Sequence, residues 1–334
     1  MNIYNYEGNN EAFILHTEKF AFLCVQFHFE FFLLRKTMFG PRDLQIHYPM
    51  FQKALLFNIS SNYLNSIIKL LNINETSSYP GYELMLQFLG PFTLFMSSRE
   101  ISERKWQRDK SKELFTYLYF HKNRFVPKDE LMRVLWGEVD DKTADRDFKV
   151  VLNSLLKVIE PNRLARVESF FITRKQSMYR LNPSATIYSD LEFFHVYIEK
   201  GMNEINAITA KEYLLKAVNL YKGELLEDKP TIEWILYHRE KTQNEYLLAI
   251  ERLAQTCTRL KEFEQTIFWA EKLIRLDPTW EEAYRLLMFA YYQLRDRTKA
   301  VKWYERCISV LKAELKVEPM NTTIQMYEMI TSYS

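Results

Sequence analysis

Between residues 144 and 160 apolar and polar positions recur with the period of an α-helix. The apolar positions, spaced by four, three and four residues, are Phe148, Leu152, Leu155 and Ile159. The opposite face carries the cationic and amide side chains of Arg146, Lys149, Asn153 and Lys157. Such a helix buries one face and exposes the other. Because lysine and arginine neutralise phosphates and asparagine can pair with base edges, the pattern favours a helix that reads DNA. A plain solvated face is the ordinary alternative.

A second pattern follows Pro161, in the sequence SFFITRKQSMYRLNP at residues 169–183. Two short apolar–polar runs flank Arg174, Lys175 and Gln176, which predicts a β-hairpin with a charged tip. An exposed turn without a binding role is the alternative for this hairpin alone. The combination of a helix and a basic hairpin is typical of a winged helix.

The residues before this helix complete such a fold. The segment Gly81–Met96 predicts two strands, broken at Gly90-Pro91. Residues 109–121 have apolar positions at helical spacing. A further helix is expected in VPKDELMRVLW, with Pro127 as its first residue. Its inward positions are Leu131, Val134 and Leu135. Strands, three helices and a hairpin therefore follow one another within one small domain.

The C-terminal part repeats itself with a period of 34 residues. Leu260, Trp269 and Ile274 match Leu294, Trp303 and Ile308. A repeat of this length is the tetratricopeptide period. Less regular helices are expected at about 190–200, 210–222 and 231–257, and a last one at about 322–331. The aromatic side chains of the repeats are expected in the core rather than in a ligand site: Trp269, Tyr284, Tyr291, Tyr292, Trp303 and Tyr304.

Residues 1–80 predict a helical segment and a linker. Amphipathic helices are expected within 41–57 and 62–73, and the polar stretch Asn72–Pro80 suits a linker. The apolar run Phe20–Leu34 is interrupted by Gln26, His28 and Glu30, so a buried helix is expected rather than a span of a bilayer. The acidic amino terminus does not resemble a secretory signal.

The sequence resembles the OmpR-type winged helix fused to the bacterial transcriptional activator domain, as in Streptomyces antibiotic regulatory proteins. The residues that carry the resemblance are Leu131, Leu135-Trp136-Gly137, Thr143-Ala144, Tyr179-Arg180-Leu181 and the string YKGELLEDKPTIEWILYHRE from Tyr221 to Glu240. It covers about residues 82–330. The segment LLRKTMFGPRDLQ further resembles the end of the helical sensor region of large ATPase-type regulators. No Gly-Lys-Ser/Thr occurs, so the chain has no phosphate-cradling loop, and a shortened regulator and a remnant of a longer one both stay open.

The resemblance implies how DNA would be contacted. The third helix would enter the major groove, the wing would touch the minor groove, and the loop Gly137–Lys142 could face RNA polymerase. The residues implied in DNA binding are Arg146, Lys149, Asn153, Ser154 and Lys157 on the helix, with Arg174, Lys175 and Arg180 on the wing. Many relatives carry a basic residue in place of Ser154, so this serine is expected to contact DNA weakly or through water.

Charge supports this division of the chain. The net charge of the 334 residues is only +2, but residues 82–181 hold 19 Lys and Arg against 14 Asp and Glu, and residues 182–334 hold 20 against 23. The basic excess lies on the predicted DNA-binding part, where it is modest enough that affinity would need specific contacts or two copies. The three cysteines, Cys24, Cys257 and Cys307, are expected as buried reduced thiols in a reducing compartment.

Enzyme function finds little support. The six histidines are scattered, and the sequence has no Gly-x-Ser-x-Gly motif and no glycine-rich nucleotide loop. The twin carboxylates Asp140 and Asp141 suit a solvated turn. We therefore expect no catalytic residue, metal site or cofactor.

These patterns predict a mainly α protein with a small α+β part, in which a winged helix-turn-helix precedes an α-helical tetratricopeptide-like domain. The expected division is 1–80, 81–184 and 185–334. The predicted function is a cytoplasmic, sequence-specific transcriptional regulator, an activator that recruits RNA polymerase. A protein–protein adaptor built on the repeats is the alternative. The expected partners are double-stranded DNA and RNA polymerase, with a homodimer left open and no membrane.

Overall fold

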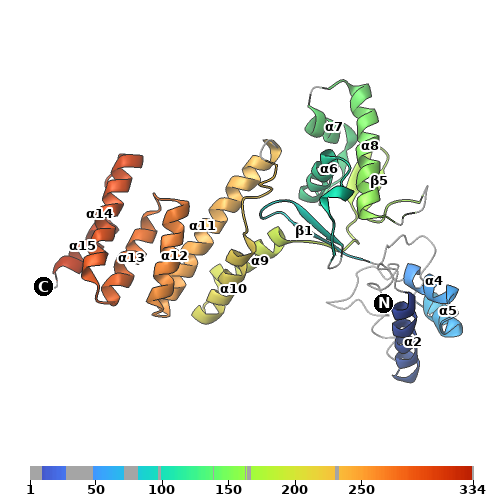
Figure 1. The fold of residues 1–334 in the computed structure, drawn as a ribbon, viewed down its shortest axis with the longest axis horizontal. Coiled ribbons are helices and arrows are strands. Elements are labelled where there is room, and N and C mark those ends of the chain that lie inside the picture. The colour runs from blue at the N-terminus through green and yellow to red at the C-terminus, as the bar shows by residue number, and fades with distance from the viewer. Residues whose placement is uncertain are drawn as a thin grey trace. The chain divides into compact units, whose positions relative to one another are not determined.

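The computed structural model describes residues 10–27, 48–70, 82–96, 99–137, 139–161, 163, 167–229 and 233–332. They divide into two compact units. The first contains the chain up to Leu86 and Thr93–Tyr188, and the second contains Gln87–Phe92 and Ser189–Ser334. The structure is mainly helical, with a small α+β winged helix followed by α-helical tetratricopeptide-like repeats (Figure 1).

The described residues before 71 form the helices α2 (Asn10–Phe27), α4 (Tyr48–Leu56) and α5 (Ser61–Leu70). Phe13, Phe51 and Leu64 meet in their common core. The run from Phe20, expected as a buried helix, is helical as far as Phe27, and one face of it is buried, with Ala21 and Cys24. Phe22 is 62% exposed, because α2 packs through one face only. Residues 28–34 and the predicted linker 72–80 lie outside the described residues. No helix in the described ranges is long and apolar enough to cross a membrane.

The α+β part contains a four-stranded sheet of order β3-β2-β1-β7. Its strands are β1 (Leu84–Gln87), β2 (Thr93–Met96), β3 (Arg99–Glu100) and β7 (Ile187–Ser189). The two strands predicted within residues 81–96 are confirmed, and Gly90 between them has a φ of 124°, which glycine adopts without a steric penalty. The short strands β3 and β7 were not predicted.

Three helices and a second sheet of order β4-β6-β5 complete the winged helix. The elements are α6 (Asp109–Phe120), β4 (Val126–Pro127), α7 (Lys128–Trp136), α8 (Asp141–Ile159), β5 (Ile172–Lys175) and β6 (Met178–Leu181). Phe115 of α6, Leu131 of α7 and Phe148 of α8 are all fully buried. Pro127 was expected as the first helical residue. It instead precedes α7 and pairs with Met178, because its extended backbone suits the edge of the sheet.

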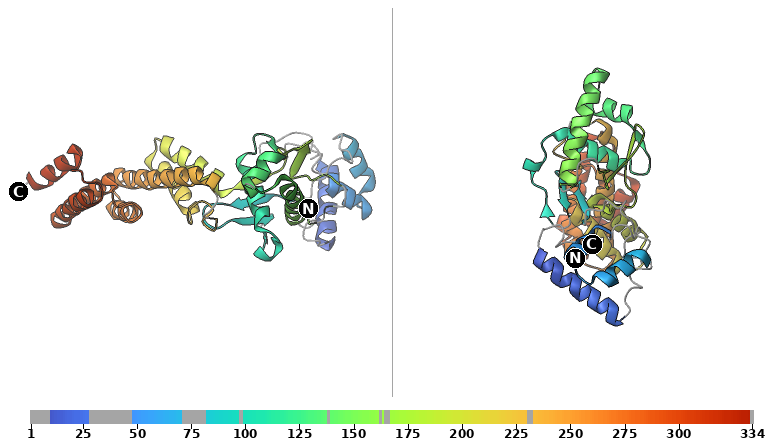
Figure 2. Two further views of the ribbon diagram at one scale, coloured as in Figure 1. Left: turned by 90° about the horizontal axis from the view of Figure 1, so that it is seen from above. Right: turned by 90° about the vertical axis from the view of Figure 1, so that its right-hand side faces the viewer.

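The second unit consists of helices that pack in order along the chain. They are α9 (Asp190–Asn203), α10 (Ala207–Leu220), the 3-10 turn η3 (Glu233–Ile235), α11 (Leu236–Arg259), α12 (Phe263–Leu276), α13 (Glu281–Gln293), α14 (Arg297–Glu314) and α15 (Asn321–Ser332). Figure 2 shows the succession from α11 to α14 from a second direction.

The 34-residue repeat is visible in the backbone of two turns. Lys261, after α11, has a φ of 59°, and Arg295, after α13, has a φ of 61°. The amide of Glu262 donates to the Cys257 carbonyl at 2.9 Å, and the amide of Asp296 donates to the Tyr291 carbonyl at the same distance. The predicted repeat is therefore confirmed at the level of hydrogen bonding.

The aromatic side chains of the repeats pack mostly inward. Tyr284 is fully buried and Trp269 is 6% exposed. The other four are half-buried: Tyr291, Tyr292, Trp303 and Tyr304. The three cysteines are buried and form no disulfide. Burial raises the pKa of Cys257 to about 11 and that of Cys307 to about 12, so both remain thiols at neutral pH.

A buried carboxylate joins the loop Gln87–Phe92 to the helical unit. Asp190, the first residue of α9, is 4% exposed. Its Oδ1 accepts the Phe88 amide at 2.8 Å, and its Oδ2 accepts the Leu89 amide at 3.0 Å. Burial raises the pKa of Asp190, against the opposing effect of these hydrogen bonds. The loop thus belongs to the helical unit although it lies between β1 and β2 in sequence.

Candidate nucleic-acid interface

The helix expected to read DNA begins at a well-defined cap. The Asp140 carboxylate accepts the Thr143 amide at 3.0 Å, which satisfies one of the free N–H groups at the start of α8. A side-chain hydrogen bond with Thr143 lowers the pKa of Asp140, and the bond to the Thr143 amide lowers it further. The helix starts at Asp141, so the connection from α7 is shorter than the predicted loop Gly137–Lys142. Asp140 and Asp141 were expected in a solvated turn, and Asp140 in addition caps the start of α8.

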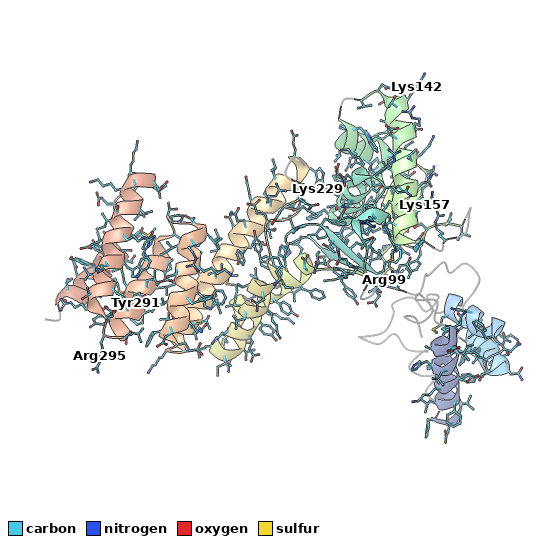
Figure 3. All side chains as sticks on the ribbon, viewed as in Figure 1. Arg99, Lys142, Lys157, Lys229, Tyr291 and Arg295 are labelled. Carbon is cyan, nitrogen blue, oxygen red and sulfur yellow. The ribbon has the colours of Figure 1, made fainter. Side chains whose placement is uncertain are left out.

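The two faces of α8 differ as the sequence predicted. Phe148, Leu155 and Ile159 are fully buried, whereas Leu152 is half-buried. The polar positions are all exposed: Arg146, Lys149, Asn153 and Lys157. Figure 3 shows Lys142 and Lys157 near opposite ends of this helix. A cationic and amide face therefore runs along α8 in the described structure.

Ser154 does not belong to that face. It is 5% exposed, and its Oγ has no hydrogen-bond partner. Ser154 comes three residues after Val151 and four before Val158, which are both buried, so the helical period turns it inward. The implied DNA contact of Ser154 is therefore corrected: its side chain is unavailable on the outer surface.

The predicted hairpin is formed by β5 and β6. Arg174 lies opposite Tyr179 and Lys175 opposite Met178, so Gln176 and Ser177 make the turn. Gln176 has a φ of 55°. The Arg174 Nε donates to the Gln176 carbonyl at 2.8 Å, and both Arg174 and Lys175 are exposed. The hairpin thus presents two cations beside a tight turn.

Arg180 occupies a different environment, at the base of the hairpin. It pairs with Thr173 across the strands and is half-buried. Its guanidinium carbon lies 4.2 Å from the ring centroid of Phe125, and its Nε is buried without a hydrogen-bond partner. This cation–π contact supports the packing of Arg180 against Phe125.

The structure brings a cation beside α8 that the sequence interpretation missed. Lys128, the first residue of α7, forms an ion pair with Asp145. Lys149 pairs with the same carboxylate at 2.6 Å. Burial lowers the pKa of Lys128, and the charges of Lys149 and Arg174 lower it further. The position directly after Pro127, at a helix start, was the available signal in the sequence.

A buried carboxylate also fixes the hairpin to the end of α8. Glu160 is 4% exposed, and its Oε1 accepts the amides of Phe170 and Phe171 at 2.7 and 3.0 Å. The same oxygen accepts the Ser169 hydroxyl at 3.0 Å. Burial raises the pKa of Glu160 despite these donors. The wing is thereby positioned by the helix that precedes it.

The described residues contain no group of three or more His, Cys, Asp and Glu that could hold a metal ion. The charged groups of this surface are cations with a few carboxylates, which suits the binding of a polyanion.

Comparisons with known proteins agree with the fold. The bacterial transcriptional activator domain matches residues 189–331. The transcriptional regulatory protein MoaR1 of Mycobacterium tuberculosis (strain ATCC 25618 / H37Rv) is 25% identical over 226 residues, which are 66% of this chain and 71% of that protein. MoaR1 of Mycobacterium bovis (strain BCG / Pasteur 1173P2) is 24% identical over 225 residues, with the same coverage.

Among solved structures, Mycobacterium tuberculosis EmbR in complex with a low affinity phosphopeptide has a similar fold. The TM-score is 0.64 at 20% sequence identity, and the match covers 75% of this chain and 65% of the EmbR chain. This chain therefore spans slightly less than two thirds of EmbR.

The carboxy-terminal part thus matches a bacterial transcriptional activator domain, and the chain is similar over two thirds of its length to proteins named as transcriptional regulators. These matches agree with the resemblance of the sequence to the Streptomyces antibiotic regulatory proteins.

Proposed function

We propose that the chain is a sequence-specific DNA-binding regulator that activates transcription by recruiting RNA polymerase. In this proposal α8 enters the major groove of double-stranded DNA, and the hairpin of β5 and β6 contacts the adjacent minor groove. Arg146 and Asn153 would pair with base edges. Lys149, Lys157, Arg174 and Lys175 would contact phosphates.

The observation that carries the proposal is the two-faced helix α8. Four polar side chains are exposed on the side opposite the buried Phe148 and Leu155. A helix of this kind fits the width of a major groove, and its arginine and asparagine can bond purine edges in pairs. The hairpin cations support the same function, because phosphate contacts fix the register of a protein on the duplex.

RNA polymerase would be met by a surface other than α8, and the connection between α7 and α8 is our candidate for it. Gly137 and Val139 lie in this connection, and both are exposed. A homodimer would add affinity at paired sites, since a single winged helix buries a small interface with DNA.

The test is binding of the full chain to a duplex from the DNA upstream of its own gene and to a random duplex, each over a range of salt concentrations. Specific binding should exceed random binding by a factor of at least about 10³, and both should weaken steeply with salt. Transcription with purified RNA polymerase should rise only on the upstream DNA. A salt-independent or absent interaction with DNA would instead support the adaptor function.

A second arm of the test separates base reading from phosphate contact. Lys149→Ala and Lys157→Ala should weaken binding to both duplexes by similar factors, because phosphates carry no base information. Arg146→Ala and Asn153→Ala should lower the preference for the upstream duplex. Unchanged preference in both of these variants would remove α8 as the reading helix.

A further inference from the structure

The acidic residue Asp145 lies within the cationic surface of the winged helix. Its Oδ2 is 2.6 Å from the Lys149 Nζ on the next turn of α8, and its Oδ1 pairs with the Lys128 Nζ at the start of α7. One carboxylate thus holds two ammonium groups from two helices. The side chains of Asp145 and Lys149 are 37% and 68% exposed, so both can meet a ligand from solvent.

The cations around Asp145 outnumber the carboxylate that joins them. Arg174 of β5 is close enough to act electrostatically on Lys128, together with Lys149. The amide of Lys128 donates to the carbonyl of Ser177 in the hairpin turn at 2.8 Å, which holds the start of α7 against the wing. Cations from α7, α8 and β5 therefore converge at this place. Asp129 is the other carboxylate that acts on Lys128.

The cluster is open to solvent. Lys128 and Asp145 line a groove of about 610 Å³ on the surface of the winged helix, whose other charged residues are Asp129, Arg133 and Asp141. The exposed Lys149 pairs with Asp145 beside this groove. Lys128 itself is only 16% exposed, and its burial disfavours the charged amine unless an anion lies beside it. In the free protein Asp145 supplies that anion.

We propose that Asp145 stands in for a DNA backbone phosphate and competes with DNA for Lys128 and Lys149. The proposal rests on the DNA binding proposed above. When a phosphate takes the two ammonium groups, the Asp145 carboxylate loses its partners and must bind a cation from solution. Since this cost does not depend on base sequence, Asp145 weakens binding to all duplexes by one factor and leaves the preference among them unchanged.

The matched control is Asp147, two residues further along α8. It is 38% exposed and pairs only with Arg146 among the described residues, at 3.3 Å. Asp145→Asn and Asp147→Asn remove the same charge from the same helix, so a difference between them reports which cations each carboxylate holds, Lys128 and Lys149 or Arg146, rather than net charge.

The experiment measures binding of the full chain by fluorescence anisotropy, on the upstream duplex and on random duplex, from low to moderate salt. Asp145→Asn should bind both duplexes roughly tenfold more tightly at low salt, and its log–log salt slope should steepen by about one unit, because one fewer cation is taken up. Asp147→Asn should gain less than about threefold and keep the wild-type slope. Thermal melting checks that each variant is folded. If Asp145→Asn is destabilised, Asp145→Ala replaces it in the binding experiment.

A double-mutant cycle with Lys128→Gln tests whether the gain in affinity depends on the pair of Asp145 with Lys128. The gain from Asp145→Asn should shrink when Lys128 is already replaced, since contacting residues are not additive. Equal affinity and salt slope for wild type and Asp145→Asn would overturn the inference while leaving DNA binding intact. A loss on the upstream duplex alone would overturn it in favour of a carboxylate that reads a cytosine amino group. Absence of salt-dependent binding by the wild type would instead reject the proposed function itself.

Discussion

The winged helix and the helical repeats treat their charged side chains differently. Both regions pair some charges with neighbours three or four residues away, as Arg285 does with Glu282 in the repeats and Lys149 with Asp145 in the winged helix. In the winged helix, Lys157 and Lys175 are exposed, and no carboxylate of the described residues lies within 4.0 Å of either. Local pairing cancels charge at close range, whereas uncompensated cations act on a polyanion. The winged helix is distinguished by Asp145, on which the cations of two helices, Lys128 and Lys149, meet.

Each region also depends on one buried carboxylate, and the two carboxylates are used differently. Asp190 divides its two oxygens between the amides of Phe88 and Leu89. Glu160 receives both its backbone donors, from Phe170 and Phe171, on a single oxygen. Replacement by the matching amide should therefore cost less at Glu160, where it removes the ion pair of the other oxygen with Arg163 at 3.3 Å, than at Asp190, because an amide keeps only one acceptor oxygen.

The largest expected effect is on the helical unit. Asp190→Ala should lower the free energy of unfolding by about 3 kcal/mol, since it leaves buried amides of the loop Gln87–Phe92 unpaired. Asp190→Asn should still cost about 2 kcal/mol, because its NH2 group faces another N–H. Urea unfolding of the full chain measures both. A loss below about 1 kcal/mol for the alanine variant would show that the loop does not depend on this carboxylate.

The next effect concerns the wing. Arg174→Glu with Lys175→Glu should weaken DNA binding by a factor on the order of 100 and flatten its salt slope by about one unit for each lost phosphate contact. Melting should stay unchanged, because both side chains are exposed. The control reverses two exposed cations of the helical unit, Lys312→Glu and Lys316→Glu, and should leave the slope at its wild-type value. A similar loss in both variants would erase the distinction between the two regions.

A smaller effect is expected for pH dependence. Burial raises the pKa of Glu160 above its ordinary value of 4.5, so the folded state holds the proton to higher pH than the unfolded chain. This group therefore favours folding most below pH 4.5, and that contribution is lost as pH rises through the raised pKa. Glu160→Gln should flatten the fall in stability with pH above this value and change stability at neutral pH by less than about 1 kcal/mol. Urea unfolding at several pH values measures the free energy of unfolding of both proteins. The same pH profile for the wild type and Glu160→Gln would contradict this prediction.

The smallest effect tests the repeat. Lys261 and Arg295 hold equivalent left-handed positions, where glycine carries no Cβ penalty. Lys261→Gly and Arg295→Gly should each stabilise the chain by about 0.5 kcal/mol, and by equal amounts. Unequal changes would mean that the two turns are equivalent in backbone only.

Much of this architecture follows from local pattern. The 3.6-residue period of apolar positions from Phe148 to Ile159 suffices to predict α8 and its exposed face, because a regular helix turns side chains by a constant angle. The hairpin around Gln176 is similarly local. The 34-residue spacing of Trp269 and Trp303 predicts the repeat, since each helix pair buries the same face against its neighbours.

Contacts between segments far apart in sequence had no such signal. Lys128 and Asp145 meet because α7 and α8 fold together, and the loop before Phe92 joins the helical unit because Asp190 accepts its amides. Period and spacing along the chain determined which elements form, through local backbone geometry. Which charges meet was decided by tertiary packing, because a carboxylate and an ammonium group interact through space, whatever their separation in sequence.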